Sequence, residues 1–261
     1  MTRRERCSPG QYLKKTLNNS CYTSNDIYSL RDTYNRIHTR RITKHNPAQI
    51  WKELLGHLQC HKESCIASRL HQSTPQFAPK SPASWLSNPN EWLTSDDISA
   101  VLYQYEDAYP SFKYIGPSPS DFYYMENGTC VWEELCRFKV TDYPHKKIGI
   151  VFNLDTHNGG GTHWVSIFMD MDKKIMYYFN STGDSIVNDP HIHTFIKKVQ
   201  TQDPSFQFKE NKVAHQFGNS ECGMYSLYFI VTMLKTGNFS HFTRNRITDK
   251  KMEALRKIIF N

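Results

Sequence analysis

One stretch of the sequence, from His215 to Leu234, constrains the fold more than any other. It begins with a polar, glycine-containing turn that ends in Glu221-Cys222-Gly223, and a largely apolar run from Met224 to Leu234 follows directly. This run predicts a buried helix of about three turns. It is too short to cross a bilayer, which takes about 20 residues. We therefore expect Cys222 at or near the first turn of a helix in the core.

The position of Cys222 makes it a candidate nucleophile. The unpaired N–H groups and the dipole at a helix N-terminus favour an anion there. A thiol in that place is expected to have a lowered pKa and to react at neutral pH. The alternative is that Cys222 is a small buried apolar residue, as most free cysteines are.

Two residues upstream predict a base and a group that orients it. Residues 162–170 and 174–180 are predicted to form two strands joined by a tight turn at Met171–Lys173. If they form a hairpin with a two- or four-residue turn, His163 lies directly opposite Asn180 on the same face. The amide oxygen could then accept Nδ1–H of the imidazole and leave the other nitrogen free to take a proton. The alternatives are a satisfied core histidine and an ordinary turn-forming asparagine.

Gln216 is a candidate donor to an oxyanion. It precedes Cys222 by six residues, in the turn that leads to it. Its side-chain amide could donate to the oxygen of an attacked carbonyl group, beside the N–H of Cys222. The alternative is an ordinary polar residue at the end of a strand.

A proline- and serine-rich segment, Gln72 to Pro89, indicates a linker and predicts two domains, residues 1–83 and 84–261. In the first, helices are expected around Asp26–Arg41 and from Pro47 to about Gln59. The net charge of +7 is concentrated there, because residues 1–80 hold 14 Lys and Arg against 5 Asp and Glu. This charge suggests nucleic acid or another acidic partner, or only a solvated arm.

The seven cysteines are odd in number and lack a framework of spacings, so we expect free thiols in a reducing compartment. His57, Cys60, His61 and Cys65 could hold zinc, but their spacing is not a standard one, and two free thiols near a helix end are the alternative. We therefore expect no metal and no cofactor. The sequence also shows no signal peptide and no transmembrane segment.

The second domain should alternate helices and strands. A helix should follow Thr94, which can form a capping box with Asp97, and Asp189-Pro190 should cap another helix that runs to Gln200. The remaining expectations are an aromatic, proline-containing loop over 109–128, strands over 147–153 and 206–216, a glycine-rich loop over 155–161, and a last helix from Thr248 that buries Met252, Leu255 and Ile258 or Ile259.

Three of these motifs together resemble the superfamily of SUMO-specific and adenovirus cysteine proteases. They are Gly-Thr-His163-Trp164 before an apolar strand, Phe179-Asn180-Ser181 at a strand end, and Gln216 followed by Cys222-Gly223. The resemblance covers roughly residues 85–261. Cellular members usually have Asp where this chain has Asn180. That departure is most similar to the polyprotein-processing branch found in large DNA viruses such as African swine fever virus.

The resemblance implies a role for each residue. Cys222 would be the nucleophile, His163 the general base and acid, Asn180 the orienting residue and Gln216 the oxyanion donor. Trp164 and Trp92 match the two tryptophans between which SUMO proteases clamp a Gly-Gly segment, although Trp92 could instead pack in the core. Gly160, Gly161 and Gly223 complete the expected substrate-binding set.

The fold implied is an α+β fold. A mixed, mainly antiparallel central sheet is flanked by helices, Cys222 starts the central helix, and a mainly helical N-terminal domain precedes it. The activity implied is that of a viral cysteine endopeptidase that cleaves structural polyproteins after Gly-Gly during virion assembly, at assembly sites in the host cytoplasm and in the virion. One alternative is the removal of SUMO or ubiquitin from proteins. The other is a non-enzymatic basic virion protein that binds nucleic acid through its N-terminal domain.

Overall fold

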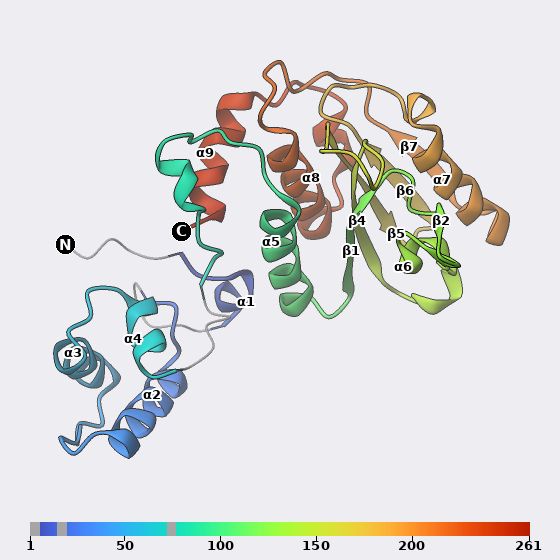
Figure 1. Cartoon of the computed structure of the whole chain (residues 1–261). Helices are drawn as coiled ribbons and strands as arrows, with labels where there is room; N and C mark the ends of the chain where they lie inside the picture. Colours follow the sequence, from blue (N-terminus) through green and yellow to red (C-terminus); the bar gives the residue numbers. More distant parts are fainter. Residues whose placement is uncertain (1–5, 15–19, 72–76) are drawn as a thin grey trace. The chain divides into compact units, whose positions relative to one another are not determined.

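The computed structural model describes residues 6–14, 20–71 and 77–261 and divides the chain into two compact units (Figure 1). One unit is Pro82–Arg256. The other comprises the residues up to Ser81 together with Lys257–Asn261. The division thus falls two residues before the boundary expected from the linker composition, and the last five residues group with the N-terminal unit.

The N-terminal unit contains helices α1 (Pro9–Tyr12), α2 (Ser24–Ile37), α3 (Pro47–His57) and α4 (Glu63–Arg69) in its described part. Thr23 and Asp26 form a reciprocal capping box that starts α2. The side chain of Asn46 accepts hydrogen bonds from the N–H groups of Ala48 and Gln49, with Pro47 in the first turn of α3. Local capping chemistry thus explains where both expected helices begin.

The expectation of free thiols is wrong for six of the seven cysteines. The structure pairs Cys7 with Cys21, Cys60 with Cys65 and Cys130 with Cys136, and leaves Cys222 free. The Cα atoms of these pairs are 5.2, 5.7 and 6.3 Å apart, within the usual range for a disulfide. Sequence spacing does not reveal such distances. Cys60 and Cys65 bind each other and are not the free thiols or zinc ligands considered above.

The core of the second unit is a mixed sheet, as the sequence predicted. Within the described residues the strand order is β1-β4-β5-β6-β7. The two central pairings, β4 with β5 and β5 with β6, are antiparallel. At the two edges, β1 is parallel to β4 and β7 is parallel to β6. The strands are β1 (Phe112–Pro119), β4 (Lys147–Asn153), β5 (Trp164–Asp170), β6 (Ile175–Phe179) and β7 (Gln207–Glu210), with a small separate hairpin of β2 (Met125–Glu126) and β3 (Thr129–Cys130).

The sequence analysis missed β1, because it assigned residues 109–128 to a loop. Pro117, Pro119 and Gly116 hide this strand, since proline and glycine are rare in strand interiors. The sheet tolerates them because β1 is an edge strand whose register with β4 shifts between Ile115 and Ser118. The strand expected over 206–216 is shorter than predicted and ends at Glu210.

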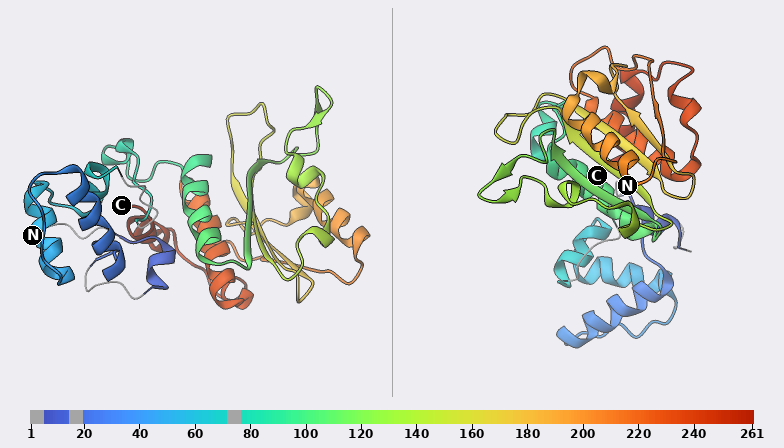
Figure 2. Two further views of the ribbon diagram at one scale, coloured as in Figure 1. Left: turned by 90° about the horizontal axis from the view of Figure 1, so that it is seen from below. Right: turned by 90° about the vertical axis from the view of Figure 1, so that its right-hand side faces the viewer.

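Helices cover both faces of the sheet (Figures 1 and 2). Helices α5 (Ser95–Ala108) and α8 (Cys222–Thr236) lie side by side on one face, and α7 (Pro190–Gln202) lies on the other. The remaining helical segments of this unit are α6 (Glu133–Cys136), the part of α9 (Asp249–Ile259) up to Arg256, and the short 3-10 turns Ala83–Leu86, Val140–Asp142, Ile186–Asn188 and Phe239–Phe242. No helix among the described residues is long and apolar enough to cross a membrane.

The first turns of α5 and α7 differ in their capping. Thr94 and Asp97 form the expected capping box of α5. The expected cap of α7 is absent, because the side chain of Asp189 makes no hydrogen bond to that helix. Its carboxylate instead accepts a hydrogen bond of 2.6 Å from the Tyr178 hydroxyl of β6. A tertiary contact has replaced the local one.

Candidate active site

Cys222 is the first residue of α8 and is 2% exposed. The helix it starts is buried along most of its length, with Met224, Leu227 and Phe229 in the core. This placement agrees with the expectation drawn from the apolar run. The thiol accepts hydrogen bonds from the backbone N–H groups of Trp164 and Gly223. Cys222 therefore lies beside the residue that follows His163.

His163 and Asn180 meet at the open end of the β5–β6 hairpin. His163 Nε2 is 2.9 Å from Asn180 Oδ1. The expected register was nevertheless wrong by two residues, because Ser166 pairs with Phe179 and Asp170 with Ile175. A shift of two residues leaves every side chain on its original face of the sheet. His163 and Asn180 thus remain on one face and are diagonal neighbours, within reach of each other.

The contacts of Asn180 determine which ring nitrogen of His163 carries the hydrogen. The backbone N–H of Thr182 donates to Asn180 Oδ1 at 3.1 Å, and the Thr182 hydroxyl lies 2.8 Å from the same atom. A backbone N–H can only donate, so the atom facing His163 is an acceptor oxygen. Nε2 of His163 must carry the hydrogen, and Nδ1 of the neutral ring is left as the acceptor. The expectation that Nδ1–H binds Asn180 was therefore wrong about which nitrogen is used.

The electrostatics of the pair differ from the sequence expectation. Burial raises the pKa of the Cys222 thiol, and the backbone hydrogen bonds from Trp164 and Gly223 only partly offset this effect. Burial also lowers the pKa of His163, against a smaller opposite effect of its bond to Asn180. The expected depression of the Cys222 pKa by the helix N-terminus is thus outweighed by burial. The structure favours a neutral thiol and a neutral imidazole.

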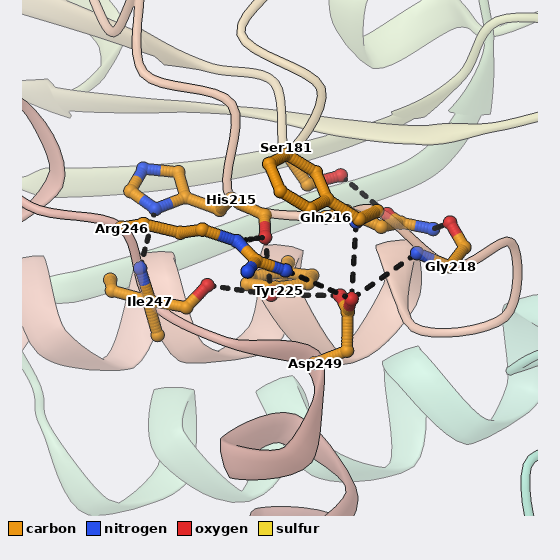
Figure 3. A network of polar contacts seen from close by, with 9 residues as sticks. Ser181, His215, Gln216, Gly218, Tyr225, Arg246, Ile247 and Asp249 are labelled. Carbon is orange, nitrogen blue, oxygen red and sulfur yellow. Dashed lines mark hydrogen bonds and ion pairs between the residues drawn. The ribbon is translucent and has the colours of Figure 1, made fainter.

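Gln216 lies in the loop before α8 and is 7% exposed. Its Oε1 accepts a hydrogen bond of 2.7 Å from the Ser181 hydroxyl, and its Nε2 donates to the carbonyl oxygen of Gly218 at 2.9 Å (Figure 3). Ser181 follows Asn180 directly, so the Gln216 amide is tied to the same end of β6 as His163. The amide has a second N–H, which these two contacts do not use.

A cleft of about 560 Å³ contains four of the five expected substrate-binding residues. Trp92, Trp164, Gly160 and Gly161 all line it. Trp164 is 6% exposed and its indole N–H donates to the carbonyl oxygen of Leu93 at 3.0 Å, whereas Trp92 is 43% exposed. Trp92 is therefore not a core residue, which removes the alternative considered for it.

Gly223 does not line the cleft. A Cβ atom at Gly223 would lie 2.9 Å from Cβ of Leu93, so the missing side chain serves close packing of α8 against Leu93. The sequence offered no way to distinguish this role from substrate contact, because both require the absence of a side chain.

The sequence analysis missed the groups that hold the glycine-rich loop in place. Asp121 accepts a hydrogen bond from the backbone N–H of His157, at 2.9 Å, and pairs with Nδ1 of the same residue at 2.7 Å. The Asp155 carboxylate accepts from the N–H of Gly161 at 3.0 Å. Asp155 belongs to the glycine-rich loop itself, so the sequence could have indicated its role in holding that loop. Asp121 lies in the segment expected to be an aromatic, proline-containing loop, and nothing in the sequence indicated its role.

Comparison with known proteins places this geometry in a family. Residues 98–261 match the model of the Ulp1 protease family, C-terminal catalytic domain. A protein of Acanthamoeba polyphaga mimivirus described as a thiol protease is 25% identical over 97% of this chain and 92% of its own length. The SUMO-1 cysteine protease of African swine fever virus (Warthog/Namibia isolate) is 30% identical over 81% of this chain and 89% of its own length.

Solved structures agree on the fold. The crystal structure of the African swine fever virus protease superposes with a TM-score of 0.67 and 22% identity, and the match covers 100% of this chain and 97% of that one. A selenomethionine form of the same viral protease gives a TM-score of 0.64 with 23% identity. The α+β fold expected from the sequence is thus confirmed.

Proposed function

The chain belongs to the Ulp1 protease family and is a cysteine-type peptidase, and we propose that Cys222, His163 and Asn180 are its catalytic triad. We propose further that it is a viral endopeptidase that cleaves structural polyproteins after Gly-Gly during virion assembly. The single observation that carries the triad is the His163–Asn180 hydrogen bond, beside a thiol that contacts the backbone of Trp164.

The neutral state of the pair defines the first chemical step. His163 Nδ1 removes the thiol proton as Cys222 Sγ attacks the scissile carbonyl carbon, so that the imidazolium and the oxyanion on the carbonyl oxygen form together. Asn180 keeps Nε2–H in place and orients the ring throughout. The carbonyl oxygen becomes an oxyanion, which accepts hydrogen bonds from the second N–H of Gln216 and from the backbone N–H of Cys222.

The second half of the reaction returns the enzyme to its starting state. The imidazolium gives its proton to the departing amine, and the acyl group stays on Cys222 as a thioester. His163 then takes a proton from a water molecule that attacks the thioester, and returns it to the sulfur when the new carboxyl product leaves. No cofactor takes part in this scheme.

The cleft supports the choice of Gly-Gly. Two indoles, Trp92 and Trp164, line it together with Gly160 and Gly161, and a channel between flat aromatic walls favours residues without side chains. Trp164 is anchored through its bond to Leu93, whereas Trp92 is partly exposed and accessible to a substrate. These features support an extended glycine segment as the group that passes between the indoles.

Peptide hydrolysis tests both parts of the proposal. Wild-type protein should cleave a Gly-Gly-X peptide, and Cys222→Ala and His163→Ala should abolish cleavage. Replacing either glycine of the peptide with alanine should slow cleavage by at least about tenfold, which is roughly 1.4 kcal/mol. In Trp92→Ala this preference should shrink, because one wall of the channel is gone. Unimpaired cleavage by Cys222→Ala would exclude the triad, and an equal rate for the alanine peptides would exclude the glycine channel.

A second candidate substrate is a SUMO or ubiquitin conjugate, since one viral relative is named a SUMO-1 cysteine protease. The same catalytic residues would serve it. Turnover of SUMO and ubiquitin fusions, measured beside a polyprotein peptide at equal concentration, distinguishes the two. Faster release of SUMO or ubiquitin would replace the polyprotein proposal.

The basic excess of residues 1–80 supports a further part of the proposal, an acidic partner such as nucleic acid at the N-terminal unit. Action at assembly sites in the host cytoplasm and in the virion belongs to the same proposal. Binding of a DNA duplex that weakens steeply with salt, and that fails when the basic residues of the unit are neutralised, would support the nucleic-acid partner. Binding that salt does not affect would exclude it.

A further inference from the structure

Helix α9 buries charge where the sequence predicted an apolar stripe. Of the residues expected inside, Met252 is buried and Leu255 and Ile259 are half-buried, whereas Ile258, named as the alternative to Ile259, is 59% exposed. Arg256 is buried instead, with 3% exposure. A buried charge is costly unless it is paired, so the polar residues on the inner face of α9 should have specific partners.

At the start of α9, Asp249 holds the backbone of the loop before α8. One carboxylate oxygen, Oδ2, accepts hydrogen bonds from the N–H groups of Phe217 at 3.1 Å and Gly218 at 3.2 Å (Figure 3). The other, Oδ1, lies 3.0 Å from the hydroxyl of Tyr225 on α8. The Arg246 guanidinium stands 3.4 Å from Oδ2. Asp249 therefore connects this loop to both helices.

The backbone held by Asp249 determines the direction of the Gln216 amide. Gly218, whose N–H binds Asp249, provides the carbonyl oxygen that accepts from Gln216 Nε2. Ser181 occupies the amide oxygen. With the oxygen and one N–H in these contacts, the remaining N–H can point in only one direction. Displacing residues 217–218 would turn that N–H away.

Two turns further along α9, Arg256 fixes the residue before the nucleophile. Its guanidinium pairs with the Glu221 carboxylate at 3.1 Å, and both side chains are 3% exposed. It also donates to the carbonyl oxygen of Glu91 at 2.6 Å and lies over the ring of Trp85, 4.6 Å from the centroid. Seven residues separate Asp249 from Arg256, about two helical turns, so both are on the same face of α9.

We propose that α9 is a positioning element for the loop from Gln216 to Cys222. Asp249 sets the direction of the oxyanion donor through residues 217–218, and Arg256 sets the place of Cys222 through Glu221. This inference rests on the proposed catalytic roles of Gln216 and Cys222. Asp249 then acts on stabilisation of the oxyanion, whereas Arg256 acts on the nucleophile, so their effects can be measured separately.

The experiment compares two reactions of Cys222 in the full-length protein. Hydrolysis of a Gly-Gly-X peptide requires an oxyanion donor, whereas alkylation of the thiol by iodoacetamide creates no oxyanion. Asp249→Ala should lower kcat by about 10- to 100-fold. This loss is smaller than the roughly 100- to 1,000-fold cost of removing an oxyanion donor, because Gln216 is misdirected and not removed. Its KM and its alkylation rate should stay within about twofold of wild type.

Two further variants control for charge and folding. Asp249→Asn keeps an oxygen that can accept from Phe217 and Gly218, and it should retain most of the wild-type kcat. Lys250→Ala changes an exposed neighbour on the same helix and should leave both reactions unchanged. An unchanged kcat in Asp249→Ala would overturn the role of Asp249. So would an equal loss of alkylation and hydrolysis, because that result indicates general disruption.

The role of Arg256 needs a pair of substitutions, because Arg256→Met alone leaves Glu221 buried and unpaired and could unfold the site. The double variant Glu221→Gln and Arg256→Met removes both charges while keeping similar volumes. If it folds, as judged by its melting temperature, its alkylation rate and its kcat should both fall. A folded double variant with wild-type rates would overturn the role of Arg256. Loss of activity in Cys222→Ala, measured beside these variants, shows whether the proposed catalytic role itself holds.

Discussion

Replacement of Gly223 by alanine tests whether close packing at the start of α8 shapes the site. A Cβ atom at this position would lie 2.9, 3.1 and 3.2 Å from Cβ, Cγ and Cδ1 of Leu93. Carbon atoms normally approach to about 3.5–4.0 Å, so the new methyl group overlaps the Leu93 side chain by roughly half an ångström or more. Leu93 also carries the carbonyl oxygen that anchors the Trp164 indole. The strain therefore reaches the wall of the cleft.

The size of the effect follows from two opposing contributions. Overpacking of this kind costs about 1–3 kcal/mol, while alanine is favoured over glycine within a helix by about 0.8–1.0 kcal/mol. The net expectation is a destabilisation of up to about 2 kcal/mol. In a protein of this size each kcal/mol corresponds to a fall in melting temperature of about 2–4 °C. Cleavage of a Gly-Gly-X peptide should fall as well, because the first turn of α8 carries Cys222.

Thermal denaturation measures this prediction, with Gly160→Ala as the matched control. A Cβ atom added at Gly160 would have no neighbouring atom within 4 Å, so the same substitution there should not lower the melting temperature. Shortening Leu93 to alanine together with Gly223→Ala should recover part of the loss, which a double-mutant cycle detects as coupling. A Gly223→Ala protein as stable as wild type, with no coupling to Leu93, would refute the packing argument.

Three further predictions concern protonation and orientation. Alkylation of Cys222 should be slow at pH 6 and rise toward and above pH 9, because burial raises the pKa of the thiol; fast alkylation at pH 6 that depends on His163 would show a pre-formed ion pair instead. Hydrolysis needs a neutral His163, and burial lowers the pKa of this residue. The value of kcat/KM should therefore persist below pH 6.5 and decline only as the pH falls through the lowered pKa. A decline of kcat/KM centred at or above pH 6.5 would contradict the burial argument. Asn180→Ala should lower kcat by at least about tenfold with little change in melting temperature, because the His163 ring becomes free to rotate and to change tautomer. Asn180→Asp keeps an oxygen that accepts from His163 and should retain more activity than Asn180→Ala.

A fourth expectation concerns stability and acid. His215 is fully buried, donating from Nε2 to the carbonyl oxygen of Phe242 and accepting at Nδ1 from the N–H of Ile247. Burial lowers its pKa from the ordinary value of 6.5, so the folded state resists protonation. Its contribution to stability is present above pH 6.5 and is lost as the pH falls toward the lowered pKa, by at most about 1.4 kcal/mol per pH unit. The pH dependence of the urea midpoint should be flatter in His215→Gln, and an unchanged dependence would contradict this assignment.

Residues with a local role were predictable from the sequence. Each capping box, before α2 and before α5, lies within four consecutive residues. The buried strand β4 and the buried helix α8 are each formed by one continuous apolar run of the sequence. The candidate catalytic residues were visible for a related reason. His163 and Asn180 flank a hairpin, so an error of two residues in the register still left them on one face.

Features that depend on distant segments were predicted wrongly or not at all. Strand β1 exists because it pairs with β4, and its prolines gave the opposite local signal. Asp189 binds Tyr178 in place of its own helix. The disulfide partners and the buried ion pair of Arg256 with Glu221 lie far apart in sequence or outside any recognisable motif.

The sequence by itself predicted the candidate catalytic residues, and it indicated that a buried helix begins at Cys222, because local periodicity and the position of residues beside a hairpin can be read from the chain. Tertiary structure alone decided the protonation of the site. Burial of Cys222 and His163, which depends on everything packed around them, outweighs the helix dipole that the sequence makes visible. It also decided what holds the loop before α8, because the contacts of Asp249 and Arg256 form only when α9 packs beside the start of α8.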